Sequence, residues 1–267
     1  MLASLPMYDL PMLSEWTDRW WDGLRQAARR HGVHDLPAEL DRRDNRHAVW
    51  QAEELAFSQI CGFPMNHAYK NRLRPILTPC YAADGCDGPR YRSALLVRED
   101  SQAQCLADLE GAQCACNEPD SQSGTNSLAR AAAGVARNAR FFSGVTFTGA
   151  HIESMRLVRE GAAAVCAVDC VTHALLSRHE PDAVAGLKRI GFTPSAPGLP
   201  YVAAPSTSED TVERLRQALR DALDDPDLSA VRDALLIAGA EPLTINDYNE
   251  ISAWPRDVLG PNTGAAG

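Results

Sequence analysis

The chain has 267 residues, of which 45% are hydrophobic and 23% are charged, and this is enough for one large globular domain or two lobes. Its formal net charge of -9 and its pI of about 5.3 argue against non-specific binding to nucleic acid or to an acidic membrane surface. No run of about 18 apolar residues occurs in the sequence, which therefore predicts no membrane span.

The first hundred residues predict a strand, a long helix and further strands. Residues 2–7 are mostly apolar and favour a strand. Trp16, Trp20 and Leu24 recur at the spacing of one helical face, so this segment predicts a helix that packs on a sheet. The other elements expected here are a helix that runs into a loop over 48–64 and strands over 74–81 and 91–100.

From residue 105 onward the predicted strands and helices alternate. We expect helices over 105–109, 123–136, 151–161 and 171–179, strands over 112–119, 143–149, 162–170, 187–194 and 199–205, and a helical tail from 208. Such alternation predicts an α/β fold with mainly parallel sheets.

Two segments of the predicted fold look like crossings between lobes. They span 88–100 and 192–205, and the second is rich in proline and glycine. If both cross, residues 95–196 form one lobe, and 1–94 together with 197–267 form a discontinuous other lobe.

The stretch 117–128, NEPDSQSGTNSL, is rich in small hydroxyl side chains and lies between a predicted strand and a predicted helix. It places Ser121, Ser123, Gly124 and Thr125 at the helix N-terminus, where backbone N–H groups and the helix dipole favour an anion. The alternative is a plain N-cap by Asp120 or Ser121 with no ligand. The sequence leaves both interpretations open.

Two further junctions carry polar side chains where a predicted strand meets a predicted helix. His151 follows the strand over 143–149, and Asp169 ends the strand over 162–170. Ligands of parallel α/β folds bind at such strand ends, although either residue could instead cap its helix. Ser123, His151 and Asp169 could also form a hydrolase triad, but the sequence lacks the G-x-S-x-G turn, so we expect no catalytic residues.

The eight cysteines do not show a metal-ligand spacing, because no C-x2-C pair occurs among them. The sequence also lacks a Walker A motif and a G-x-G-x-x-G fingerprint. We therefore expect neither a metal nor a cofactor. Cys80 and Cys86 flank a turn and could pair in an oxidising compartment.

Several motifs in this order resemble those of a known family. They are PMYD, SQICGFP, GPRYRS, LADLEG, NEPDSQSGTN, TGAHIESM, AVDC and FTPSAPGLP, within residues 2–205. The pattern resembles the phosphate/phosphonate substrate-binding proteins of ABC transporters, the PhnD-like family. The resemblance implies an α/β, two-lobed type II periplasmic-binding-protein fold with two crossover strands and a ligand cleft between the lobes.

The resemblance also implies a function and a set of ligand contacts. The chain is expected to be a binding protein, not an enzyme, for a small phosphate- or phosphonate-type oxyanion, either as the solute-binding protein of an ABC-type uptake system, with an ABC permease as partner, or as a non-exported relative. The second lobe would contribute Ser121, Ser123, Gly124, Thr125, His151 and Asp169, and the first lobe Tyr8, Gln59 and Tyr91. An enzyme or a ligand-sensing regulator on the same fold, acting on a small phosphorylated metabolite, is the alternative.

The family resemblance and the N-terminal residues predict different cellular locations for the protein. Members of the PhnD-like family are periplasmic, whereas the first residues, MLASLPMYDLPML, lack the basic start and long apolar block of a signal peptide. A cytoplasmic location is expected if Met1 is the native start.

Overall fold

The computed structural model describes all residues of the chain except 44, 253–256 and 264–267. The chain divides into two compact units. Unit 1 comprises Met1–Ala82, Asp87–Pro89 and Pro197–Asn249, and unit 2 comprises Ala83–Cys86, Arg90–Ala196 and Glu250–Gly267. The predicted lobes, 1–94 with 197–267 and 95–196, differ from this division chiefly at 250–267, which the contacts assign to unit 2.

Unit 1 contains a four-stranded mixed sheet with the order β1-β2-β12-β3. β1 (Leu2–Ser4) is parallel to β2 (Leu55–Gln59), whereas β12 (Tyr201–Ala203) is antiparallel to both β2 and β3 (Arg74–Pro75). A separate antiparallel pair consists of β4 (Thr78–Tyr81) and β13 (Ile237–Glu241). The helices of this unit are α1 (Ser14–Arg30), α2 (Arg46–Trp50), α3 (Gly62–Asn66), α7 (Glu209–Asp224) and α8 (Ser229–Ala234).

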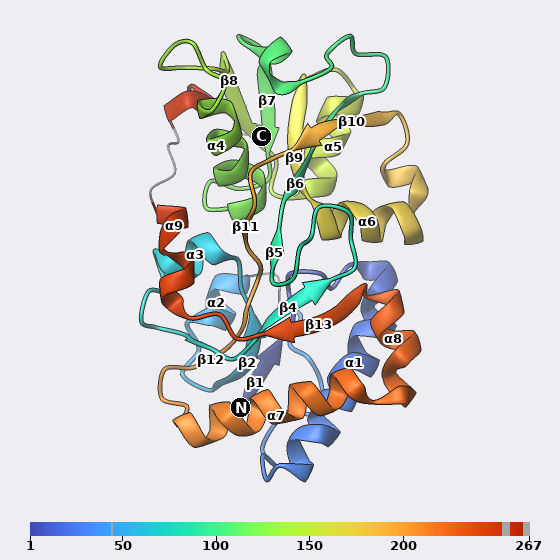
Figure 1. The fold of residues 1–267 in the computed structure, drawn as a ribbon, viewed down its shortest axis with the longest axis vertical. Helices are drawn as coiled ribbons and strands as arrows, with labels where there is room; N and C mark the ends of the chain where they lie inside the picture. The colour runs from blue at the N-terminus through green and yellow to red at the C-terminus, as the bar shows by residue number, and fades with distance from the viewer. Residues whose placement is uncertain (44, 253–256, 264–267) are drawn as a thin grey trace. The chain divides into compact units, whose positions relative to one another are not determined.

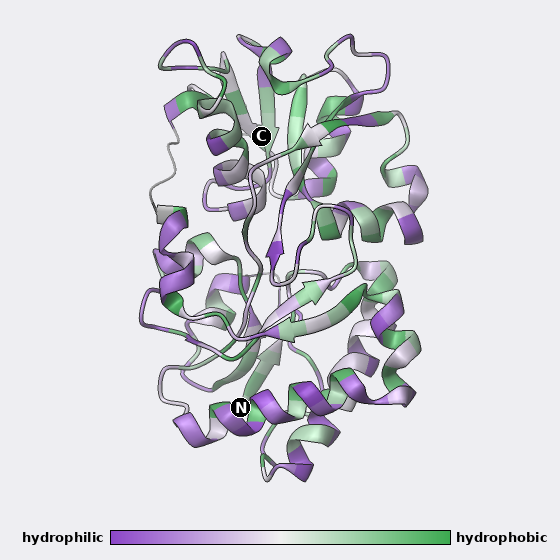
Figure 2. Ribbon diagram, in the orientation of Figure 1, coloured by the Kyte–Doolittle hydropathy of each residue, from purple (hydrophilic) through white to green (hydrophobic). Residues whose placement is uncertain are grey.

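The long helix α1 confirms the apolar periodicity read from the sequence. Trp20 and Leu24 of the predicted face are buried, together with Trp21, whereas Trp16 of that face is only half-buried. The indole N–H of Trp20 donates to the Tyr201 hydroxyl at 3.2 Å, so this tryptophan packs in the core of unit 1. Helix α7 packs against α1 and is also amphipathic, with hydrophilic and hydrophobic stretches alternating along its ribbon (Figure 2).

Unit 2 contains a five-stranded sheet with the order β10-β6-β9-β7-β8. Its strands are β6 (Ser93–Arg98), β7 (Gln113–Cys116), β8 (Gly144–Phe147), β9 (Val165–Asp169) and β10 (Leu187–Phe192). β7 is parallel to β8 and β9, but β6 is antiparallel to β9 and β10. Both larger sheets are therefore mixed, and the expectation of mainly parallel sheets was wrong for β6, β10 and β12.

Helices α4 (Ser127–Ala133) and α5 (His151–Arg159) lie on opposite faces of this sheet, and α6 (Cys170–His179) follows β9 (Figure 1). Successive side chains of a strand alternate between the faces. Cys114 and Cys116 of β7 accordingly lie in the same apolar cluster as Leu128 of α4. None of the helices in the described part of the chain combines the length and the hydrophobicity that a membrane crossing requires.

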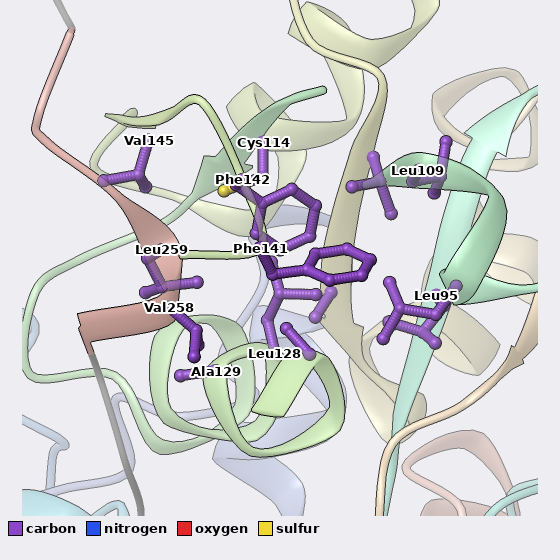
Figure 3. Close-up of a cluster of buried hydrophobic side chains, with 14 of the residues drawn as sticks. Leu95, Leu109, Cys114, Leu128, Ala129, Phe141, Phe142, Val145, Val258 and Leu259 are labelled. Carbon is purple, nitrogen blue, oxygen red and sulfur yellow. The ribbon is translucent and has the colours of Figure 1, made fainter. Parts of the chain in front are cut away.

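The C-terminal segment, residues 257–263, packs against the core of unit 2. Val258 and Leu259 are 7% and 3% exposed and lie in one cluster with Phe141 and Phe142 (Figure 3). The backbone N–H groups of Phe141 and Phe142 both donate to the carbonyl of Val258, at 2.9 and 3.0 Å. Apolar burial and backbone hydrogen bonds together fix this segment to unit 2.

Two strands were predicted as other structures. The residues of β2 lie in the segment expected to run from helix to loop, and all five of them are buried. A strand that is buried throughout lacks the alternation that identifies a half-buried strand. β13 overlaps the predicted tail helix, but α8 ends at Ala234 and Leu236 has a φ of 58°, which stops the helix.

Candidate functional site

Three strands of unit 2 end side by side at one edge of the sheet. β7 ends at Cys116, β8 at Phe147 and β9 at Asp169, and the pairs β7–β8 and β7–β9 are parallel. The segments that leave this edge carry all the residues that the sequence assigned to the ligand side of the second lobe. They are Ser121, Ser123, Gly124, Thr125, His151 and Asp169.

The segment after β7 forms a compact turn that we call the hydroxyl loop, residues 121–125. It is mostly a π-helical turn, Gln122–Asn126, which continues into α4. The Ser121 hydroxyl accepts the Gly124 N–H at 3.0 Å, and the Thr125 hydroxyl donates to the Glu118 carbonyl at 2.5 Å. Ser121 is therefore the N-cap, as one interpretation of the sequence predicted. Its hydroxyl proton is not used by that bond and could be donated to an anion.

Ser123 and His151 come from two different strand-to-helix junctions and meet at hydrogen-bond distance. The Ser123 hydroxyl lies 2.9 Å from Nε2 of His151, the first residue of α5. Ser123 is only 2% exposed, and the Ser93 hydroxyl donates to its carbonyl at 2.8 Å. Ser93 was not singled out from the sequence. The sequence placed Ser93 near the start of the strand predicted over 91–100 and gave no other sign of its role. Its position beside this site depends on the register in which β6 pairs with β9, where Ser93 lies opposite Asp169.

Gly124 is required by its neighbour Asn117. A Cβ atom on Gly124 would lie 1.9 Å from the side-chain oxygen of Asn117 and 3.0 Å from its Cγ. The Asn117 side chain therefore packs directly against the backbone at Gly124.

We expect Gly124→Ala to destabilise the protein by roughly 1–3 kcal/mol, because either Asn117 or the hydroxyl loop must shift. Chemical denaturation would measure the loss. Gly134→Ala is the matched control. Gly134 has a φ of -70°, and a Cβ there would come no closer than 3.4 Å to another atom, so Gly134→Ala should leave the unfolding free energy unchanged or raise it by up to about 1 kcal/mol. Equal effects of the two substitutions would contradict the steric argument.

Asp169 acts as the N-cap of α6. Its Oδ1 accepts the backbone N–H groups of Val171 at 2.8 Å and Thr172 at 3.3 Å, and the residue is 2% exposed. Such a cap stabilises a helix by about 1 kcal/mol. The capping role that the sequence offered as an alternative is thus present, and it holds Asp169 at the edge that carries the hydroxyl loop.

The residues predicted on the first lobe fall into two groups. Tyr8 and Gln59 lie in unit 1, and both contact Tyr81. The ring of Tyr8 meets that of Tyr81 edge-on at 5.0 Å, and the Gln59 amide donates to the Tyr81 hydroxyl at 3.1 Å. Tyr91 instead lies in β5 (Arg90–Tyr91), within unit 2, where it is 3% exposed.

Tyr81 contacts both Tyr8 and Gln59 but is not among the site residues predicted from the sequence. Its place at the end of the strand predicted over 74–81 was the available signal. The amide of Gln59 also donates to the Leu199 carbonyl at 3.0 Å, so its orientation is fixed within unit 1.

Two features limit the chemistry that the site can perform. Residues 117–128 contain no lysine or arginine, so the hydroxyl loop offers neutral donors. Within the described residues, no group of three or more His, Cys, Asp and Glu side chains is arranged to hold a metal ion. The arrangement suits the binding of an anion by hydroxyls and backbone N–H groups.

The chain matches one protein family over residues 51–248, and that family is described as "ABC transporter, phosphonate, periplasmic substrate-binding protein". No curated protein matches the chain in sequence.

Several solved structures share its fold. PhnD1 from Prochlorococcus marinus, in complex with methylphosphonate, has a TM-score of 0.73 and 15% identity, with 94% of this chain and 95% of that chain covered. A binding protein component of an ABC phosphonate transporter from Pseudomonas aeruginosa has a TM-score of 0.72 and 15% identity, with 94% and 84% covered. XAC2383 from Xanthomonas citri, bound to chloride ion, has a TM-score of 0.68 and 17% identity, with 95% and 96% covered. The fold is the type II periplasmic-binding-protein fold.

Proposed function

Because the chain belongs to the family of periplasmic substrate-binding proteins of phosphonate ABC transporters, we propose that it binds a small phosphate- or phosphonate-type oxyanion. It would do so as the solute-binding protein of an ABC-type uptake system, with a permease as partner, or as a non-exported relative. The family is one of solute-binding proteins, not of enzymes.

The hydroxyl loop is the observation that carries the proposal. Three hydroxyls lie within five consecutive positions just before α4, those of Ser121, Ser123 and Thr125. The oxygens of a phosphonate need several donors at once, and the Ser121 and Ser123 hydroxyls with backbone N–H groups of the loop can supply them without a charged side chain, whereas Thr125 donates its proton to the Glu118 carbonyl. The overall negative charge of the chain does not oppose binding, since local donors and dipoles set the potential in a closed site.

The proposal also includes the other residues that the sequence predicted as ligand contacts. In unit 2 they are His151, which already bonds Ser123, together with Gly124, Asp169 and Tyr91. In unit 1 they are Tyr8 and Gln59, which Tyr81 holds together. Tyrosine rings can cover an apolar substituent and donate a phenolic hydrogen bond, which fits an organic phosphonate better than inorganic phosphate.

The structural neighbours support the ligand class without fixing the ligand. The Prochlorococcus marinus protein is described in complex with methylphosphonate, whereas XAC2383 is described with chloride in one structure and with ATP in another. The same fold therefore carries different anions.

Isothermal titration calorimetry with methylphosphonate, phosphate and phosphite tests the proposal. At least one of these anions should bind at micromolar to submillimolar concentration, and sodium chloride at the same ionic strength should release no saturable heat. Mass spectrometry of the recovered ligand should show it unchanged, because the proposed activity is binding. The absence of saturable binding for all three anions at millimolar concentration would contradict the proposal, and a converted ligand would favour the enzyme alternative.

A further inference from the structure

Two cysteines that lie far apart in the sequence meet in unit 2. Cys86 and Cys170 have their sulfur atoms 3.5 Å apart, and all eight cysteines of the chain are present as thiols. Cys170 is the first residue of α6, immediately after the capping residue Asp169, and is 2% exposed. Cys86 is half-buried, so a reagent in solvent can reach this thiol more easily than that of Cys170.

The turn that carries Cys86, residues 83–86, is held against unit 2 by its other residues as well. Asp84 forms an ion pair with Arg189 at 2.7 Å. Gly85 has a φ of 107°, and a Cβ there would lie 2.8 Å from the Phe192 ring and 3.1 Å from Cβ of Cys170. Only glycine combines this backbone conformation with such close packing. The pairing of the two sulfur atoms is thus set by neighbouring contacts on the same unit.

The sulfur separation is suitable for a disulfide. A disulfide bond is about 2.05 Å long, so the two sulfur atoms, now 3.5 Å apart, must move together by about 1.5 Å. The two thiols differ in reactivity. The hydrogen bond with Cys86, burial and the nearby Asp169 carboxylate all raise the pKa of Cys170, and because Cys170 is also the less exposed of the two thiols, an oxidant reaches Cys86 first.

We propose that Cys86 and Cys170 form a disulfide that fastens residues 83–86 to the start of α6. With a small disulfide such as oxidised glutathione as oxidant, the Cys86 thiolate attacks one glutathione sulfur and releases one glutathione. Cys170 then loses its proton to solvent, attacks the Cys86 sulfur and releases the second glutathione. In total the two protein thiols lose two electrons and become one disulfide, and one glutathione disulfide gains these electrons and becomes two thiols.

Other cysteines have different surroundings. Cys114, Cys116 and Cys166 are fully buried in the core of unit 2, where an oxidant cannot enter the folded protein. Cys105 is exposed and serves as a control that the oxidant is active. The sequence suggested Cys80 as the partner of Cys86, and the experiment distinguishes this partner from Cys170.

The disulfide would enclose the hydroxyl loop and His151 in one covalent loop, residues 86–170. Closing a loop of this length restricts the unfolded chain, and we expect the melting temperature to rise by roughly 5–10 °C relative to the reduced protein. This inference concerns thiol chemistry and does not depend on which anion the protein binds.

Peptide mapping of the full-length chain provides the test. The protein is incubated with oxidised glutathione at mildly alkaline pH, blocked with N-ethylmaleimide, digested without reductant and analysed by mass spectrometry. We expect a peptide pair joined through Cys86 and Cys170, two fewer free thiols from this pair, and glutathione on Cys105. Cys86→Ser should lose the joined peptide and the rise in melting temperature, whereas Cys80→Ser should keep both.

Cys86→Ser also separates chemistry from folding, because this residue is half-buried and its replacement should leave the fold intact. A joined peptide between Cys80 and Cys86 would overturn the proposal. So would glutathione on both Cys105 and Cys86 without any bond from Cys86 to Cys170.

Discussion

Ser123→Ala is expected to weaken the binding of the phosphonate- or phosphate-type ligand by roughly 10- to 100-fold, as calorimetry would show. A hydrogen bond to a charged group contributes about 1.5–3 kcal/mol, and the loss of the donor removes it. Ser123 is buried at the centre of the hydroxyl loop, and its hydroxyl also contacts Nε2 of His151 at 2.9 Å. The substitution removes one donor and one partner of the imidazole without changing the charge of the site.

Ser177→Ala is the matched control for this prediction. The Ser177 hydroxyl donates a hydrogen bond to the carbonyl of His173 within α6, and Ser177 is exposed. Its alanine variant should bind the ligand as the wild type does, with an unchanged melting temperature. If Ser123→Ala binds the ligand as tightly as Ser177→Ala, the hydroxyl loop is a helix cap only, which is the interpretation that the sequence left open.

The sequence predicted well the junctions where β7, β8 and β9 of unit 2 end, because the signals for a strand, a loop and a helix lie close together in the chain there. The strand, loop and helix signals around 112–136, 143–161 and 162–179 all correspond to elements of the structure, β7 to α4, β8 to α5 and β9 to α6. Each of these junctions places a polar residue where a strand ends and a helix begins. Parallel pairing of β7 with β8 and β9 then brings His151 and Asp169 to the edge that holds Ser123.

The parts that the sequence could not predict depend on pairing between distant segments. Tyr81 contacts Gln59, 22 residues away, and Ser93 contacts the carbonyl of Ser123, 30 residues away. Neither contact leaves a periodic pattern in the chain. The strand β2 was missed for a related reason, since a fully buried strand has the same composition as a buried helical segment.

For the same reason, the sequence could not predict which unit contains the C-terminal segment. The two predicted crossings leave both ends of the chain in one lobe, so the sequence predicts 197–267 in the first lobe. The structure instead buries Val258 and Leu259 beside Phe141 and Phe142 (Figure 3). Two apolar residues in a short 3-10 turn, Asp257–Leu259, carry no signal that names their partner.

Leu259→Ala is accordingly expected to destabilise unit 2, by about 2–5 kcal/mol, because it removes a buried leucine and leaves a cavity beside the two phenylalanines. The rate at which a reagent labels the buried thiols of unit 2 would measure this loss of stability. Cys114 and Cys116 are 0% exposed, and they react with a thiol reagent only when the unit opens. Their labelling should become at least roughly 30-fold faster in the variant under conditions where opening is in equilibrium.

Leu215→Ala provides the comparison, since Leu215 is a leucine of α7 that is buried to the same degree in unit 1. The two substitutions remove the same atoms from different cores. Because Leu259 contacts the cluster around Cys114 directly, its replacement should accelerate labelling at Cys114 more than Leu215→Ala does, even if the units partly unfold together. Unchanged labelling of Cys114 in Leu259→Ala would show that the C-terminal segment does not stabilise unit 2, and would return residues 257–263 to the first lobe, where the sequence placed them.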